Sequence, residues 1–376
     1  IAQCKESVWK YKGMWEDFSG TVGFWADMKN PYVTYDDKYI ESEWWALRQI
    51  WDKGLLYRGF KIVPYCPRCG TPLSTQEVAQ GYKTVKERSA IVKFPSADEK
   101  GVYFLAWTTT PWTLPSNVAL AVNPDETYIR AEVGEETYIL AKALAPKVLK
   151  DGYTVTAEMK GRELEGKNYL PLYDFAKPDG RAYYVVCADY VTMEDGTGIV
   201  HTAPAFGEDD AQTGRRYGLP FVQLVDAKGC MTENTGRFAG LFVKAADPEI
   251  LSDLKERGLL FAAPNFEHEY PHCWRCGTPL IYYARDSWFI RMTDVRDDLV
   301  RNNNTVNWIP EGIGRGRFGS WLENVQDWGI SRNRYWGTPL NIWECKCGHR
   351  HCVGSVEELR KMSRNCPEHI ELHRPY

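Results

Sequence analysis

The sequence contains no uninterrupted apolar run long enough to cross a bilayer, and its first residues show no hydrophobic signal segment. It also has no marked excess of charge of one sign, since 46 basic residues stand against 50 acidic ones and the net charge is −4. Bulk charge therefore does not indicate a nucleic-acid partner, and any contact with RNA must come from a local basic patch. Two candidates are RNNNTVNW (301–308) and GRGRFG (314–319), although solvated loops would explain these segments equally well.

The pattern of cysteines argues against a secreted disulfide scaffold. The eleven cysteines are an odd number, and most of them gather in three tight clusters. A reducing, cytoplasmic environment with bound zinc is the interpretation that we favour. The chain begins at Ile1 without a methionine and stops at Tyr376, so we expect it to be a fragment of a longer protein.

The order of apolar patterns predicts several structural units, and 376 residues are enough for two or three cores. Residues 36–57 predict a helix with Asp36 or Asp37 as its cap. Short β-rich runs, separated by Gly, Pro and Asp, fill residues 88–245 and are typical of a closed or partly closed β-barrel. Further helices are predicted at 247–257, capped by Asp247, and at 355–364, opened by a Ser355–Glu358 capping box.

Two nearly identical segments, CPRCGTPL (66–73) and CWRCGTPL (273–280), predict a metal site. Each is a Cys-x-x-Cys-Gly half, in which glycine permits the turn that directs both sulfurs at one ion. One structural zinc shared by both halves would fasten together the two ends of the block between them; its ligands would be Cys66, Cys69, Cys273 and Cys276. The alternative is that each pair belongs to an unrelated site or consists of buried free thiols.

The third cluster, CKCGHRHC (345–352), is less regular because one residue rather than two separates Cys345 from Cys347. We favour a zinc half-site at Cys345 and Cys347. A complete local site remains open as the alternative, with further ligands drawn from His349, His351, Cys352 and Cys366.

Two polar segments point to chemistry: WTTTPWTLPSN (107–117) and GTGIVHTAPAFGEDD (196–210). The first supplies small hydroxyl groups, and the second supplies one histidine and a group of carboxylates. Such a set suits the positioning of a polar substrate and a water molecule. The plain alternative is that Thr108, Thr109 and Thr110 are ordinary β-branched strand residues.

Taken together, these motifs resemble the isoleucyl-tRNA synthetase family, specifically its editing domain and the flanking segments. Further matching segments are 29–59, 65–74 (YCPRCGTPLS) and 327–343 (DWGISRNRYWGTPLNIW). Valyl and leucyl enzymes typically carry Thr-Thr-Arg-Pro and Pro-Ala-His-Asp where this chain reads TTTPWT and PAFGED, which is similar to the isoleucyl pattern.

The resemblance implies an α/β fold in which a β-barrel-rich editing domain is inserted among surrounding helices, zinc knuckles and partial Rossmann-type catalytic segments. The expected divisions are a catalytic or connective segment with the first knuckle (1–85), the editing domain (86–266), a return segment with the second knuckle (267–330) and a partial catalytic segment with the third cluster (331–376).

The resemblance also implies roles for individual residues in hydrolysing valyl-tRNA. Thr108 and Thr109 would lie beside the ester, and Thr110 and His201 would shape a small side-chain pocket. Asp210 would hold the α-ammonium group of the substrate by a charge-assisted hydrogen bond. Trp112 would form part of the wall, and Asn117 matches a polar position of the same motif.

Bland alternatives remain for three of these residues. His201 could be a strand histidine with its hydrogen bonds satisfied. Asp210 could favour a helix N-terminus near Glu208, and Trp112 could be a core residue.

The synthetic site is expected to be incomplete in this chain. The family's His-Ile-Gly-His signature is absent, and KMSRN (361–365) continues a helix instead of forming the glycine-rich Lys-Met-Ser-Lys-Ser loop. ATP and Mg²⁺ would therefore act only in the full-length enzyme.

The implied partners are tRNA(Ile) and a valyl or isoleucyl group, and we expect a monomer. The competing hypothesis is a zinc-stabilised tRNA-binding module without hydrolytic activity. A general metallohydrolase is disfavoured because no ligand set leaves an open coordination position.

Overall fold

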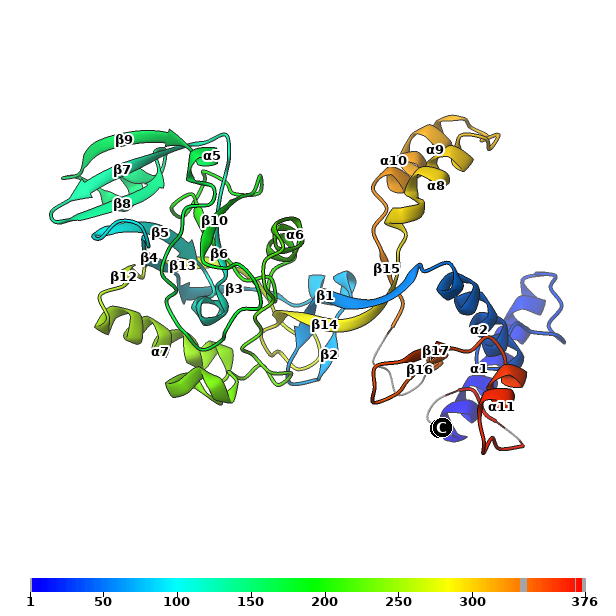
Figure 1. Ribbon diagram of the computed structural model, residues 1–376. Coiled ribbons are helices and arrows are strands. Elements are labelled where there is room, and N and C mark those ends of the chain that lie inside the picture. Colours follow the sequence, from blue (N-terminus) through cyan, green and yellow to red (C-terminus); the bar gives the residue numbers. More distant parts are fainter. Residues whose placement is uncertain (1, 332–336, 369, 374–376) are drawn as a thin grey trace. The chain divides into compact units, whose positions relative to one another are not determined.

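The computed structural model describes residues 2–331, 337–368 and 370–373. The chain forms two compact units, one of residues Phe60–Asp286 and one of Ile1–Gly59 together with Ser287–Tyr376 (Figure 1). The chain enters the first of these along β1 (Leu56–Cys66) and leaves it along β14 (Ile281–Ile290). None of the helices in the described part of the chain is long and apolar enough to cross a membrane.

The unit of residues 60–286 is built on a mixed, curled sheet with the strand order β10-β6-β11-β5-β8-β7-β9 (Figure 1). In addition, β4 pairs with β5, and β12 pairs with β4. Every predicted β-rich run contains one of its strands, which confirms that part of the sequence analysis. The strands are β4 (Ala90–Pro95), β5 (Val102–Thr108), β6 (Ala119–Val122), β7 (Thr127–Val133), β8 (Glu136–Ala141), β9 (Thr154–Lys160), β10 (Tyr184–Cys187), β11 (Ile199–Thr202) and β12 (Leu260–Ala262).

Strand β5 is the centre of this sheet. It pairs antiparallel with β4 along one side, and on the other side with β8 at Val102–Phe104 and with β11 at Trp107. Its last residues therefore lie between β4 and β11. The strand pairings of the described residues do not close the sheet into a ring, so the structure supports a curled sheet rather than a complete barrel.

The core of this unit is formed by alternate residues of the strands and by one face of α7 (Val243–Glu256). Phe94, Phe104, Leu120 and Ile139 are buried against one another, and Ile250 of α7 joins the same cluster. Shorter elements complete the unit: β2 (Thr71–Pro72), α3 (Thr75–Ala79), η1 (Pro111–Ser116), α4 (Ala145–Leu149), α5 (Gly161–Leu164), α6 (Glu208–Tyr217) and η2 (Glu233–Phe238).

A separate two-stranded ribbon joins β3 (Tyr82–Arg88) and β13 (Asn265–Pro271), in register from Arg88 with Asn265 to Tyr82 with Pro271. At one end of the ribbon, the two segments of the chain approach each other closely. A Cβ atom on Gly81 would lie 1.8 Å from the carbonyl oxygen of His272, so only glycine fits there. The ribbon therefore holds the two cysteine segments at the same end of the unit.

Two predicted helix boundaries are wrong. The helix predicted at 247–257 begins at Val243, because Val243 and Ala246 share the apolar spacing of Ile250 and are buried with it. Asp247 is consequently an internal residue and not the cap. The helix predicted at 36–57 is α2 (Asp37–Asp52); it ends before Gly54, whose φ is +71°, and Leu56 begins β1.

The other unit contains α1 (Ala2–Thr21), α2, η3 (Thr293–Val295), α8 (Arg296–Asn303), α9 (Gly312–Arg315), α10 (Arg317–Glu323) and α11 (Val356–Met362), with the short strands β15 (Trp328–Gly329), β16 (Ile342–Glu344) and β17 (Arg350–Cys352). The predicted cap of α11 is confirmed, since Ser355 Oγ accepts the Glu358 amide at 3.1 Å. The Rossmann-type segments stay a prediction, because these strands do not form such a sheet among the described residues.

Candidate functional site

The three threonines follow β5 into a tight turn. Thr108 ends the strand, Thr110 precedes the 3-10 helix η1, and Pro111 opens that helix with the fixed φ that its first position requires. The Thr108 hydroxyl accepts the Thr110 amide at 3.0 Å. The Thr113 hydroxyl donates to the Thr110 carbonyl oxygen at 2.8 Å. The hydroxyl groups of this turn are therefore held by the backbone of the turn itself.

His201 lies on β11, and the pairing of Val200 with Trp107 brings it beside the threonine turn. Its Nε2 lies 2.8 Å from the Thr113 hydroxyl oxygen. Because the single Thr113 hydroxyl proton is already donated to Thr110, this contact requires a proton on Nε2. Burial lowers the pKa of His201 to about 4, so the ring is neutral at physiological pH.

Because the neutral ring of His201 carries its proton on Nε2, Nδ1 has a lone pair and can only accept a hydrogen bond. This atom is buried and has no hydrogen-bond partner among the described residues. A buried acceptor without a partner costs free energy in the folded protein. Nδ1 therefore lies within the wall of the pocket and is not accessible to water.

Asp210 occupies the first turn of α6, in agreement with the alternative that it favours a helix N-terminus. Its carboxylate nevertheless turns back toward β11. Its Oδ2 accepts the Ala203 amide at 2.9 Å, and its Oδ1 accepts the Tyr190 hydroxyl at 3.3 Å. Burial raises the pKa of Asp210 to about 6, against the two hydrogen bonds that lower it. At neutral pH the carboxylate is therefore mostly ionised, held by two donors, and able to pair with a cation.

These side chains line one pocket of about 220 Å³. Its polar wall contains five residues that were predicted from the sequence, and its apolar wall comes from the strands and from the loop before α6. The lining residues are Trp107, Thr108, Thr109, Thr110, Thr113, Val200, His201, Ala203, Phe206 and Asp210.

Two residues predicted for the site do not line this pocket. Trp112 is only 2% exposed and packs edge-on against Phe206, with ring centroids 5.0 Å apart. Asn117 is buried, donates to the Ala119 carbonyl oxygen at 2.8 Å and accepts the Tyr169 hydroxyl at 2.6 Å. Both residues hold the walls in place, and a direct role for either in catalysis stays a prediction.

Sequence reasoning missed half of the lining. Thr113 could have been predicted from the sequence, since it follows Thr110 at the spacing of one 3-10 turn in the same polar motif. Trp107, Val200, Ala203 and Phe206 had none, because apolar residues in strands and loops look the same whether they face a core or a pocket.

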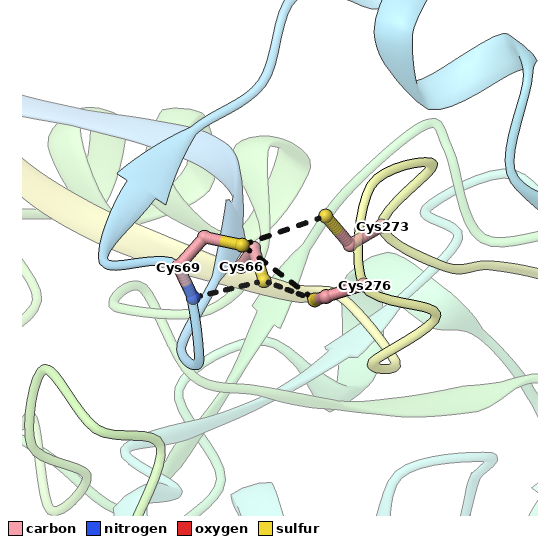
Figure 2. Close-up of side chains that lie close together, drawn as sticks. All are labelled: Cys66, Cys69, Cys273 and Cys276. Carbon is pink, nitrogen blue, oxygen red and sulfur yellow. Dashed lines mark hydrogen bonds between the residues drawn. The ribbon is translucent and has the colours of Figure 1, made fainter.

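The four predicted cysteines come together (Figure 2). Cys66 and Cys69 come from the end of β1 and the turn after it, and Cys273 and Cys276 from the turn after β13. The sulfur atoms of Cys66 and Cys276 lie 3.5 Å apart, those of Cys69 and Cys276 3.6 Å, and those of Cys69 and Cys273 3.9 Å.

The donor set fits a structural zinc ion. Tetrahedral coordination at a Zn–S distance of about 2.3 Å places sulfur atoms about 3.8 Å apart, close to the separations found here. Leu73, Val78 and Leu280 bury the cluster from the sides. All ligand positions are taken by thiols, so such an ion would be structural and not catalytic.

The third cluster forms the tip of a hairpin between β16 and β17. A disulfide joins Cys345 to Cys347, so neither sulfur is a free thiol there, and the predicted half-site gains no support. The rings of His349, just before β17, and His351, within it, lie 4.5 Å apart. Cys352 is buried.

Comparisons with known proteins agree with this architecture. The family model described as tRNA synthetases class I (I, L, M and V) matches residues 1–373. The isoleucine–tRNA ligase of Clostridium novyi is 59% identical over all of this chain, and that of Thermus thermophilus is 50% identical over 99% of it. The chain spans 36% of the length of each of these relatives.

Among solved structures, the editing domain of the P. knowlesi cytosolic leucyl-tRNA synthetase covers 50% of this chain and 98% of its own length, at 14% identity and a TM-score of 0.39. The corresponding P. falciparum domain covers 47% of this chain and 99% of its own, at 10% identity and a TM-score of 0.37. From the family match over nearly its whole length, the chain belongs to the class I tRNA synthetases, and its curated relatives at 50–59% identity are isoleucine–tRNA ligases.

Proposed function

We propose that this chain carries the editing site of an isoleucine–tRNA ligase and hydrolyses valine from mischarged tRNA(Ile). The observation that supports this most is the pocket in which four threonines, a neutral histidine and an ionised aspartate meet. A module that only bound tRNA would have no need for this set of polar groups in one cavity. Synthesis of isoleucyl-tRNA with ATP and Mg²⁺ would belong to the whole ligase, which we expect to act as a monomer.

The proposed reaction is hydrolysis of the ester between valine and the terminal adenosine of the tRNA. Water adds to the ester carbonyl carbon, the bond to the ribose oxygen breaks, and that oxygen leaves with a proton as a hydroxyl group. Asp210 would fix the α-ammonium group by a charge-assisted hydrogen bond. The hydroxyls of Thr108 and Thr109 would orient the water molecule and the ester.

The site positions groups in advance instead of supplying a nucleophile. Because the turn and β11 already hold Thr113 and His201, little reorganisation is needed when the substrate binds. The neutral ring of His201 would act through its hydrogen bond to Thr113, which fixes that part of the pocket wall.

Size would provide the specificity. One methylene in an apolar pocket is worth about 1–3 kcal/mol, and isoleucyl-tRNA synthetase is the known example of this limit. The synthetic pocket of the whole ligase would select isoleucine over valine within this limit. A second pocket that admits valine and rejects isoleucine would multiply that selectivity. Thr110 and His201 stand at the wall that would exclude the larger side chain.

The decisive experiment compares the deacylation of valyl-tRNA(Ile) and isoleucyl-tRNA(Ile) by the 376-residue chain. We expect faster loss of valine than of isoleucine. Binding of tRNA without hydrolysis of either ester would instead favour the zinc-stabilised binding module.

We also propose that Cys66, Cys69, Cys273 and Cys276 hold one zinc ion. The ion would join the entry and the exit of the inserted unit. Closing a loop of about 200 residues costs chain entropy, and zinc–thiolate bonds exceed that cost.

A further inference from the structure

The turn that carries the threonines has an N-terminus that it does not cap itself. Thr110, the residue before η1, makes no side-chain capping bond, and Pro111 has no amide hydrogen. The amide of Trp112 is therefore one of the free donors expected at a helix start. Because Thr110 and Thr113 flank this amide and both line the pocket, the position of the pocket wall depends on what receives the amide hydrogen.

The acceptor comes from a distant part of the sequence. Oδ1 of Asp247, on α7, accepts the Trp112 amide at 2.8 Å. The carboxylate acts here as the N-terminal cap of η1, although it lies inside another helix. This explains why an Asp-Pro pair that resembles a helix start occurs within α7.

Other charged groups surround this carboxylate and come from three elements. Lys244 of α7 pairs with Glu87 of β3 at 2.7 Å, and its ammonium group lies over the ring of Tyr270 of β13 at 4.2 Å. His268 of β13 faces the same Glu87 oxygen at 3.7 Å. Asp247 lies within the electrostatic influence of Lys244 and Glu87, while its hydrogen bond reaches the threonine turn.

We infer that Asp247 is a positioning residue of the hydrolytic pocket, which fixes Thr110 and Thr113 by capping η1 at the Trp112 amide. The expected effect of Asp247 on hydrolysis rests on the proposed function. The expected effect on the Trp112 amide does not. Asp247 itself does not line the pocket. Its effect on the substrate would therefore pass entirely through the backbone of the threonine turn.

The test compares three variants of this chain. Asp247→Ala removes the acceptor, and Asp247→Asn keeps an acceptor oxygen while removing the charge. Asp253→Asn is the matched control, since Asp253 is a carboxylate on the same helix and pairs with Arg237 and Arg257, neither of which belongs to η1. The measurements are hydrogen–deuterium exchange resolved to the Trp112 amide, and kcat and KM for valyl-tRNA(Ile).

For Asp247→Ala we expect faster exchange at the Trp112 amide and a fall of about 10-fold or more in kcat. KM should change much less, because the ammonium contact through Asp210 is intact. Asp247→Asn should keep both the protection of the amide and most of the rate, and Asp253→Asn should leave both as in the wild type.

Unchanged exchange at the Trp112 amide in Asp247→Ala would overturn the inference, as would equal losses of rate in Asp247→Ala and Asp253→Asn. If Asp247→Ala does not fold, Asp247→Asn decides alone, and a folded Asn variant with an unprotected amide counts against the inference. A wild-type chain that hydrolyses neither ester would refute the proposed function, while the amide exchange would still test the cap.

Discussion

At the scale of single residues, we expect the proposed site to depend on one carboxylate, Asp210, and its charge. Replacing Asp210 by Ala should slow valyl-tRNA hydrolysis by about 10- to 150-fold, the equivalent of a charged hydrogen bond worth about 1.5–3 kcal/mol. Single-turnover deacylation measures the loss. Asp209→Ala is the matched control, because Asp209 is the neighbouring, exposed carboxylate of α6 and does not line the pocket. Equal losses in the two variants would place the ammonium contact elsewhere.

The pKa values of the site predict opposite trends for activity and stability. Burial raises the pKa of Asp210 from 3.8 to about 6, so hydrolysis should rise from pH 5 to pH 7 as the carboxylate ionises. His201, with a pKa of about 4, stays neutral throughout this range.

The stability of the folded state should change with pH in the opposite direction. A carboxyl group whose pKa is raised by folding favours the folded state while it is protonated, below about pH 4, and this contribution is lost as the pH rises through about 6. Asp210→Asn should therefore reduce the slope of both the rate profile and the profile of melting temperature over this range, while Asp247, whose pKa burial raises to about 7, still titrates. A wild-type rate that is level from pH 5 to pH 7 would contradict the assignment.

Thr110 should control specificity more than rate. Thr110→Ala removes a methyl group and a hydroxyl from the pocket wall, which gives space for the additional methylene of isoleucine. We expect the variant to hydrolyse isoleucyl-tRNA while it keeps its activity on valyl-tRNA, and parallel deacylation assays of both esters measure the change. A preference for valine as strong as in the wild type would show that another residue sets the size limit.

The sequence was informative about polar residues and uninformative about their apolar neighbours. Thr108, Thr109, Thr110, His201 and Asp210 could be predicted because the two segments that carry them resemble those of a known family; on their own, the threonines would fit an ordinary strand equally well. Phe206 could not, since the same side chain would serve equally well in a core. The sequence also could not predict which nitrogen of His201 carries the proton, because this depends on the acceptor of the Thr113 hydroxyl.

At the scale of the elements, strands were easier to predict than helix starts. The short apolar runs between turn residues located β4 to β11, and several of these strands, such as β6 and β10, are buried along their whole length. The start of α7 was misplaced for a physical reason: Asp247 is a capping residue, but it caps η1 instead of its own helix. A one-dimensional sequence does not show which helix a carboxylate reaches.

The two cysteine turns should release their metal together. We expect about one zinc ion per chain, and Cys273→Ser should lose it, because the remaining three thiols leave an incomplete tetrahedral set. Metal analysis of the purified variant measures the loss, and melting temperature should fall with it. Cys230→Ser is the control, since Cys230 is a free thiol outside the cluster. Full retention of zinc in Cys273→Ser would refute the shared site.

At the scale of the whole molecule, the chain consists of two compact units and spans 36% of its curated relatives. The pocket and the cysteine cluster both belong to the unit of residues 60–286. Hydrolysis and zinc binding are therefore expected to depend on this unit, whereas the synthesis of isoleucyl-tRNA requires groups that the 376 residues do not contain.

We accordingly expect no activation of isoleucine by this chain. The His-Ile-Gly-His signature does not occur in it. Lys361, which heads the KMSRN segment, lies in the last turn of α11 and pairs with Glu357 at 2.6 Å, instead of standing in a glycine-rich loop where it could reach a phosphate. Isoleucine-dependent ATP–pyrophosphate exchange should therefore remain at background in a preparation that still hydrolyses valyl-tRNA. A full-length isoleucine–tRNA ligase assayed in parallel is the positive control, and exchange by this chain above background would show that the synthetic site is complete without the missing signature.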